Sequence, residues 1–208
     1  MKIKTLAAMC KRAGVFKLYD RADAAGEVTE QWLGTGAAMY RLPALPYLTE
    51  DNLVAFFDIT EKQRRESISF YHSQMPESLN FNDTDDEESL VEREQMILHY
   101  KNRSMQPIMT RSGLEFVDTA FLSPIADIMG ELALYERCRA HDGQVYFVAK
   151  MGLLIEAVIM PLQLKEEDFV RTVEAVAKNG RAAFIAKKER DAQRDAEAGQ
   201  TIIDDGEA

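Results

Sequence analysis

Two similar stretches of this sequence are separated by a constant offset of 116 residues. Residues 18–21 (LYDR) recur as residues 134–137 (LYER). A single offset that relates a strand, a glycine turn and a helix start favours an internal duplication. The alternative is that two ordinary units with the same order of elements converged on similar residues. The further matches at this offset are Gly36 with Gly152, and Glu50–Val54 with Glu166–Val170.

The repeated unit has the pattern of three antiparallel strands followed by an amphipathic helix. Turn residues that bound short segments predict the strands, and Thr49 is a suitable N-cap for the first helix. A sheet with one apolar face under a helix forms a self-sufficient layer. We therefore expect an α+β protein with antiparallel sheets, packed helices and duplicated strand-strand-strand-helix units. The expected strands are Val15–Arg21, Val28–Leu33 and Ala37–Leu42 in the first half, and Leu132–Arg139, Gln144–Lys150 and Leu153–Met160 in the second.

Four more elements are predicted outside the strands of the repeat. Thr5–Ala13 has apolar residues at helical spacing, and Gly14 is placed to end this helix. The remaining predictions are a strand at Ser67–His72, a hairpin from Pro107–Arg111 and Leu114–Leu122, and a helix at Glu166–Asn179 that ends at Gly180. The expected division of the chain is a first domain at 1–122, a shorter second repeat unit at 123–187, and a charged, disordered tail at 188–208.

An acidic run interrupts the first expected domain, within residues 76–95. Asp83 to Glu88 superficially resembles a calcium loop, but it lacks the central glycine and the distal glutamate of an EF-hand. We interpret it as a solvated, flexible linker.

The overall charge limits the classes of partner. The formal net charge of −10 opposes non-specific binding to nucleic acid and to anionic membranes, although a local basic face remains compatible with it. The longest apolar stretch, Met151–Leu162, contains Glu156 and is far shorter than the ~20 residues that span a bilayer. Cys10 and Cys138 lie far apart in the sequence, which is typical of free thiols in a reducing compartment. We expect a cytoplasmic protein without membrane contact.

No motif nominates a catalytic, cofactor or metal site. The histidines lack metal-ligand spacing, and no phosphate-binding glycine loop or nucleophile elbow is present. We therefore predict a protein that is not an enzyme. Basic residues gather near the N-terminus instead, and a second basic group follows the last predicted helix. A basic helix face can contact phosphates without reading sequence. The candidate DNA-backbone contacts are Lys4, Lys11, Arg12, Lys17 and Lys178.

A simpler explanation covers two of these charges. Lys11 and Arg12 lie at the end of the first predicted helix, where cations complement the helix dipole.

The order of these elements resembles the sliding clamps of DNA replication. The resemblance covers most of residues 1–180. It rests on the opening helix Thr5–Ala13, the strands to Leu42, the helix at Leu53–Ile59 and the strand Ser67–His72. It also rests on the hairpin from Ile108 to Pro124 and on the strand pair within Asp142–Gly152 and Ala157–Leu162. It implies a homo-oligomer, with a trimeric ring if each chain supplies two of six domains. It also implies contact with double-stranded DNA through phosphates, and a polymerase-type protein partner.

Three functions follow from the sequence, in order of preference. The first is a non-enzymatic, clamp-like protein that encircles or holds DNA and tethers replication partners. The second is a protein-interaction or accessory module of a phage or mobile element with no DNA role. The third is an enzyme whose site is assembled from scattered residues.

Overall fold

The computed structural model describes residues 1–42, 45–92, 96–100 and 102–164, together with residues 171, 173–176, 178–179, 181–182 and 185–190. Residues 1–163 form one compact unit and residues 164–208 a second. The described residues between 171 and 190 are helical. The first part of the predicted helix Glu166–Asn179 and most of the predicted tail lie outside the described residues. Among those described, no helix combines the length and apolar character needed to cross a membrane.

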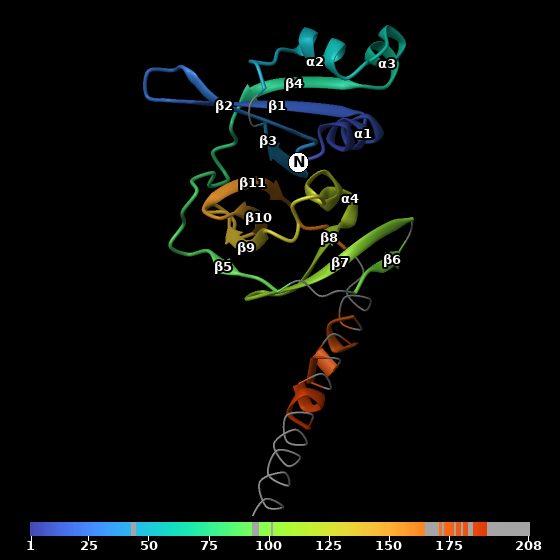
Figure 1. The fold of residues 1–208 in the computed structure, drawn as a ribbon, viewed down its shortest axis with the longest axis vertical. Coiled ribbons are helices and arrows are strands. Elements are labelled where there is room, and N and C mark those ends of the chain that lie inside the picture. The colour runs from blue at the N-terminus through green and yellow to red at the C-terminus, as the bar shows by residue number, and fades with distance from the viewer. Residues whose placement is uncertain are drawn as a thin grey trace, which may run out of the picture. The chain divides into compact units, whose positions relative to one another are not determined.

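An eight-stranded sheet forms the centre of the first unit (Figure 1), in the order β4-β1-β2-β3-β11-β10-β9-β5. It contains two antiparallel meanders, and their six predicted strands are confirmed, each to within one residue. The meanders join where β3 pairs with β11. The bounds are β1 Val15–Ala22, β2 Val28–Gly34, β3 Ala38–Arg41, β9 Leu132–Cys138, β10 Val145–Met151 and β11 Leu154–Ile159.

The first hairpins of the two meanders pair in the same register once the offset of 116 residues is applied. Tyr19 lies opposite Trp32 in β1–β2, and Tyr135 lies opposite Val148 in β9–β10. The second hairpins differ, because a bulge beside Lys150 shifts the pairing of β10 with β11. The matching stretches thus occupy equivalent hairpins, while duplication as their origin stays a prediction.

The helices begin at recognisable caps. Helix α1, Ile3–Ala13, starts two residues earlier than predicted and ends at Gly14 in the left-handed conformation, as expected. Helix α2, Glu50–Phe56, has Thr49 as its N-cap. A further helix, α3 at Glu61–Glu66, was not predicted, although Thr60 and Gln63 form a capping box at its start. Strand β4, Ser69–Gln74, follows and pairs with β1 in parallel.

A separate three-stranded sheet contains the predicted hairpin. It consists of β6 Leu98–Tyr100, β7 Arg103–Thr110 and β8 Gly113–Asp118. The prediction that the second hairpin strand runs to Leu122 is wrong. The Asp118 carboxylate accepts a hydrogen bond from the Ala120 N–H at 2.9 Å and starts the short helix α4, Thr119–Leu122. The 3₁₀ turn η1, Ser123–Ile125, follows directly.

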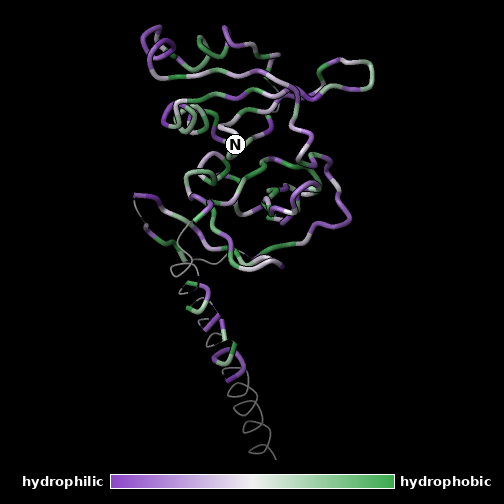
Figure 2. Tube along the Cα trace, turned by 180° about the vertical axis from the view of Figure 1, so that it is seen from behind, coloured by the Kyte–Doolittle hydropathy of each residue, from purple (hydrophilic) through white to green (hydrophobic). Residues whose placement is uncertain are grey.

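The two faces of the large sheet have different covers. One face, here the helix face, packs against α1, α4 and η1 through a core that includes Leu6, Tyr40 and Ile125. The other face carries Trp32 and Tyr146 and is covered through Phe81 of the acidic run. Figure 2 colours most of the segment that leads to β5 (Ser89–Leu90) as hydrophilic.

The interpretation of the acidic run as a solvated, flexible linker is wrong for residues 79–88, here called the acidic strap. The strap contacts two basic side chains that are almost fully buried, Arg137 and Lys150. The Arg137 guanidinium donates to the Glu88 carboxylate and to the carbonyl oxygens of Asn80 and Asn82, the last two at 2.9 Å. Two buried cations need anionic partners, and the strap supplies them.

Candidate functional site

A groove of about 550 Å³ opens between α1 and the corner where β7, β8 and α4 meet. It lies on the helix face of the large sheet, because α1 forms one wall. Its volume is in the range of small-molecule and anion sites. The lining residues are Met9, Arg12 and Ala13 of α1, Asn102–Ser104 around the start of β7, and Asp118–Phe121 with Ser123 on the opposite wall.

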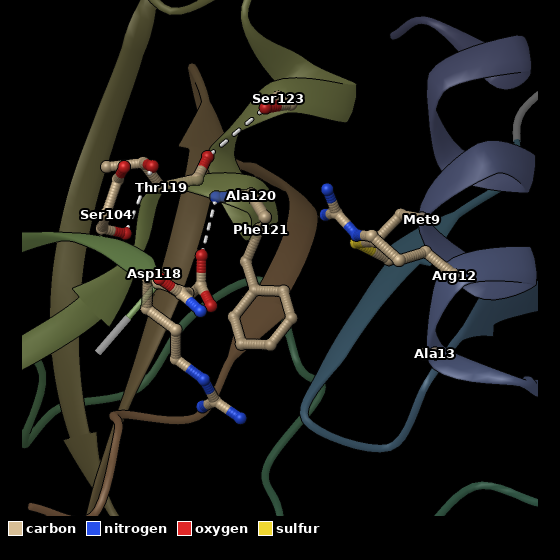
Figure 3. Close-up of a pocket in the computed structure, with 11 residues that line it drawn as sticks. Met9, Arg12, Ala13, Ser104, Asp118, Thr119, Ala120, Phe121 and Ser123 are labelled. Carbon is tan, nitrogen blue, oxygen red and sulfur yellow. Dashed lines mark hydrogen bonds between the residues drawn. The ribbon is translucent and has the colours of Figure 1, made fainter. Parts of the chain in front are cut away.

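The wall opposite α1 is held by its own hydrogen bonds (Figure 3). The Thr119 hydroxyl donates to the Ser104 carbonyl oxygen at 3.1 Å, and the Ser123 hydroxyl donates to the Thr119 carbonyl oxygen at 3.2 Å. The Tyr40 hydroxyl donates to the Phe121 carbonyl oxygen from the core side. Burial raises the pKa of Tyr40, so this hydroxyl stays a neutral donor. The wall is therefore fixed before any ligand arrives.

Arg12 projects into the groove from the last turn of α1. Its side chain leaves α1 and points toward the wall that carries Phe121 and Ser123 (Figure 3). The residue is exposed, and among the described residues its guanidinium has no hydrogen bond or ion pair. The groove thus holds at least one cation whose donors are available to a ligand.

Arg103 brings a second cation to the same groove from a distant part of the sequence. It follows Asn102, which turns the chain with a φ of 64° between β6 and β7. Arg103 is exposed, and it too has no hydrogen bond or ion pair within the described residues. Asp118 is the single carboxylate among the lining residues, and the Ala120 N–H already bonds to it. Two arginines and one aspartate leave the groove with a net positive charge.

The structure places the predicted contact residues in different parts of the chain, and only Arg12 lines the groove. Lys4 lies on the exposed face of α1, two turns before Arg12. The Lys11 ammonium donates to the Asp58 carbonyl oxygen at 3.4 Å. Lys17 lies on the opposite face of the sheet, with its ammonium 5.7 Å from the centre of the Tyr71 ring. Lys178 is an exposed residue of the second unit.

Sequence reasoning missed Arg103. The signal that could have found it is the polar tetrad Tyr100–Arg103, in which an asparagine at the second turn position predicts a tight hairpin. That turn fixes where the following arginine emerges. What the sequence does not contain is the packing of α1 against η1, which follows α4 directly and brings Arg12 opposite this corner.

A histidine–aspartate pair lies elsewhere, at β4 and β1. The nearly buried Asp20 carboxylate is 2.8 Å from His72 Nε2 and accepts hydrogen bonds from Tyr47 and Gln31. Such a carboxylate orients an imidazole, as it does beside a nucleophile in hydrolases. Within the described residues, no serine, threonine or cysteine side chain is hydrogen-bonded to this imidazole. In the same part of the chain, no group of three or more His, Cys, Asp or Glu residues is arranged to hold a metal ion.

Comparison with known proteins gives no relative from which a function could be transferred. No family model matches the chain, and no curated protein and no solved structure matches it either.

Proposed function

We propose that the protein is a non-enzymatic DNA-binding protein that holds duplex DNA by its phosphates, through the groove and the exposed face of α1. The observation that carries the proposal is the pair Arg12 and Arg103. Both guanidinium groups line one groove, come from separate elements, and have no partner among the described residues. They do so in a chain whose net charge is −10, which makes a local positive site unusual.

The chemistry of the two arginines suits a phosphate. A guanidinium group presents several N–H donors in a fork that matches two phosphate oxygens, and it stays charged at all relevant pH values. Lys4 lies eight residues before Arg12 on the exposed face of α1, roughly 12 Å along the helix axis. This spacing provides a second phosphate contact beyond the groove. Contacts of this kind fix orientation without reading sequence.

Binding of a labelled DNA duplex at low salt tests the proposal, with fluorescence anisotropy as the readout. We expect the wild type to bind, and the double variant Arg12→Ala/Arg103→Ala to lose affinity by about tenfold or more. The slope of log K against log salt should fall by roughly 2, because each lost phosphate contact contributes about 0.9.

The matched control for this experiment is Arg65→Ala. Arg65 is an exposed arginine of α3 whose one described ion pair is with Glu61, and the variant removes a positive charge away from the groove. Its affinity should stay within about twofold of the wild type, since exposed charges elsewhere contribute little. A wild type that fails to bind the duplex at low salt overturns the proposal, as does equal loss in the control.

The clamp-like form of this proposal adds that the protein encircles DNA and tethers a polymerase-type partner. Its support is the pair of first hairpins, β1–β2 and β9–β10, which share one register at an offset of 116 residues and which we infer to belong to a duplicated unit. Both meanders belong to one compact unit and one sheet. The expectation of a trimer assumed two separate domains in each chain, so we do not extend the proposal to that stoichiometry.

The second candidate is a protein-interaction module without a DNA role. The net charge of −10 favours it, because an acidic surface repels DNA outside the groove. In that case the wild type and the double arginine variant would be indistinguishable in the anisotropy experiment.

A further inference from the structure

The residues that line the groove between α1 and the corner of β7, β8 and α4 are buried to different degrees. Arg12 and Arg103 are exposed, and Phe121 is partly buried. Met9, which also lines the groove, is only 4% exposed. This order of burial indicates that the guanidinium groups lie at the mouth and the apolar side chains lie deeper. A ligand that enters the groove therefore meets positive charge first and an aromatic ring after it.

Phe121 is the single aromatic residue among the described residues that line the groove. Its ring extends from α4 into the space between that wall and α1 (Figure 3). Part of the side chain packs against the core, and part lines the groove. The backbone of Phe121 is held as well, because its carbonyl oxygen accepts a hydrogen bond from the Tyr40 hydroxyl. A ring that is held in this way can stack against a planar ligand at little cost in conformational entropy.

The size of the groove separates a single strand from a duplex. A groove of about 550 Å³ accommodates a ligand of the size of a nucleotide, whereas a double helix is far larger. In a duplex the bases are paired and stacked inside, and the phosphates lie outside. A duplex can thus present phosphates to the exposed arginines, but no base reaches Phe121. An unpaired nucleotide can turn its base into the groove while its phosphates stay at the mouth.

We propose that the groove binds an unpaired nucleotide of a DNA strand that continues from the duplex. The base stacks on Phe121, and the phosphates on either side of it contact Arg12 and Arg103. A positively charged groove combined with an aromatic ring is the usual way in which proteins bind single strands. Lys4, on the exposed face of α1, remains available to the duplex part. The inference rests on the proposed function, because both assign phosphates to the two arginines, and it names a junction between duplex and single strand as the partner.

Stacking in this groove should tolerate any base. The hydroxyl groups of Thr119 and Ser123 already donate to backbone carbonyl oxygens, at 3.1 Å and 3.2 Å, so these protons do not read a base edge. Met9 and Ala13 add apolar surface without hydrogen-bond specificity. Every base has a π-face that can lie against Phe121. We therefore expect binding that depends on an unpaired base and little on which base it is.

Three DNA ligands test the proposal with the full-length chain, by fluorescence anisotropy at low salt. They are a blunt duplex, the same duplex with an overhang of about four thymidines, and the same duplex with as many abasic sites in the overhang. The two overhangs carry equal phosphate charge, so the difference between them measures the contribution of the bases. We expect the wild type to bind the thymidine overhang at least about fivefold more tightly than the abasic overhang.

Phe121→Leu should reduce this preference to less than about twofold, because leucine is apolar but has no aromatic face. Its affinity for the blunt duplex should stay within about twofold of the wild type, since a duplex base does not reach this position. Phe121→Tyr keeps the aromatic face and is the matched control, with the wild-type preference. A Phe121→Leu variant that retains the full preference for thymidine overturns the proposal.

Photocrosslinking provides a second measurement that needs no variant. An iodinated uracil in the overhang should crosslink to Phe121 of the wild type, as mapped by mass spectrometry, and crosslinks confined to residues outside the groove overturn the proposal. Equal affinity for the thymidine and abasic overhangs also overturns it, while leaving the proposed duplex contact, which the blunt duplex measures. Conversely, tight binding of the thymidine overhang without any binding of the blunt duplex overturns the duplex contact and supports the inference.

Discussion

At the scale of single residues, Gly14 connects three elements, because it lies between α1 and β1 and bonds to the start of β4. It ends α1 with a φ of 68°, and its N–H contacts the carbonyl oxygens of Cys10 and Lys11. Its own carbonyl oxygen accepts the Ser69 N–H, which aligns β4 beside β1. A Cβ atom at this position would lie 2.9 Å from the Ser67 carbonyl oxygen. Both the left-handed backbone and the close approach therefore require glycine.

We predict that Gly14→Ala lowers the free energy of unfolding by more than Gly26→Ala does. Each change places a side chain on a left-handed backbone, which costs roughly 1–2 kcal/mol. Gly26 has a φ of 84° and nothing within 4 Å of an added Cβ, so it reports the backbone cost alone. Urea unfolding measures both variants. If both variants lose the same free energy of unfolding, the close approach of the added Cβ to the Ser67 carbonyl oxygen does not destabilise the protein.

Residues that act locally were predictable, and those that act across the fold were not. Gly14 and Thr49 were assigned as caps, because the conformation each requires depends on its immediate neighbours. The sequence gives no comparable signal for the burial of Arg137. Its place in a strand was predicted, but its partners come from a segment about 50 residues earlier. Arg103 belongs to the same class, since its role depends on α1.

At the scale of elements, the acidic strap is bound to the sheet by charge as well as by packing. Burial alone would raise the pKa of Asp85, but the Glu87 N–H, the Asn80 amide and the Arg137 charge outweigh it. The pKa of Asp85 consequently lies below its ordinary value of 3.8. A carboxylate with a lowered pKa stabilises the folded state when ionised. That contribution is complete at neutral pH and is lost as pH falls through the folded-state pKa.

We predict that Asp85→Asn destabilises the protein at pH 7 and that the difference from the wild type shrinks in acid. Urea unfolding at pH 7 and at about pH 3 measures the difference. Asp86→Asn is the matched control at pH 7, because Asp86 is exposed and has no described hydrogen bond. A difference between Asp85→Asn and wild type that is the same at both pH values would contradict the assigned role of the carboxylate.

Elements with strong periodicity were predicted, and elements defined by capping or by tertiary contacts were missed. The six meander strands are short segments bounded by turn residues, and their predicted bounds agree with the structure to within one residue. Helix α3 has no buried residue and therefore no apolar stripe to find. Helix α4 follows an apolar strand without a break in hydrophobicity, and only the cap at Asp118 marks the change. The strap is polar apart from Leu79 and Phe81, and so short an apolar content does not distinguish a bound segment from a solvated one.

At the scale of the whole molecule, both meanders belong to one sheet within the compact unit of residues 1–163. The predicted boundary at residue 122 falls at the end of α4, inside this compact unit. The chain beyond β11 is still anchored, since the Met160 N–H bonds to the Ala37 carbonyl oxygen and the Leu162 N–H to that of Phe116. The local patterns identified two similar halves. These local patterns could not predict that β3 pairs with β11 and so joins the two halves in one sheet.

We predict that a fragment of residues 1–163 folds and unfolds in one cooperative transition, while a fragment of residues 1–122 does not. The shorter fragment lacks β9–β11, so β3 has no second neighbour and the strap has no Arg137 or Lys150 to bind. Thermal melting followed by circular dichroism distinguishes the two. Cooperative folding of the 1–122 fragment would contradict the single-unit arrangement.

Because β3 pairs with β11, the sheet cannot be completed during translation until β11 has been synthesised. Tyr40 pairs with Ala157, so the N-terminal meander leaves the ribosome well before its central neighbour exists. At translation rates of about 5–20 residues per second, the interval is roughly 6 to 23 seconds. During this interval, the edge of β3 (Ala38–Arg41) that later pairs with β11 has no partner strand. Chaperones that hold nascent chains would act on this intermediate, well before the mature protein exists.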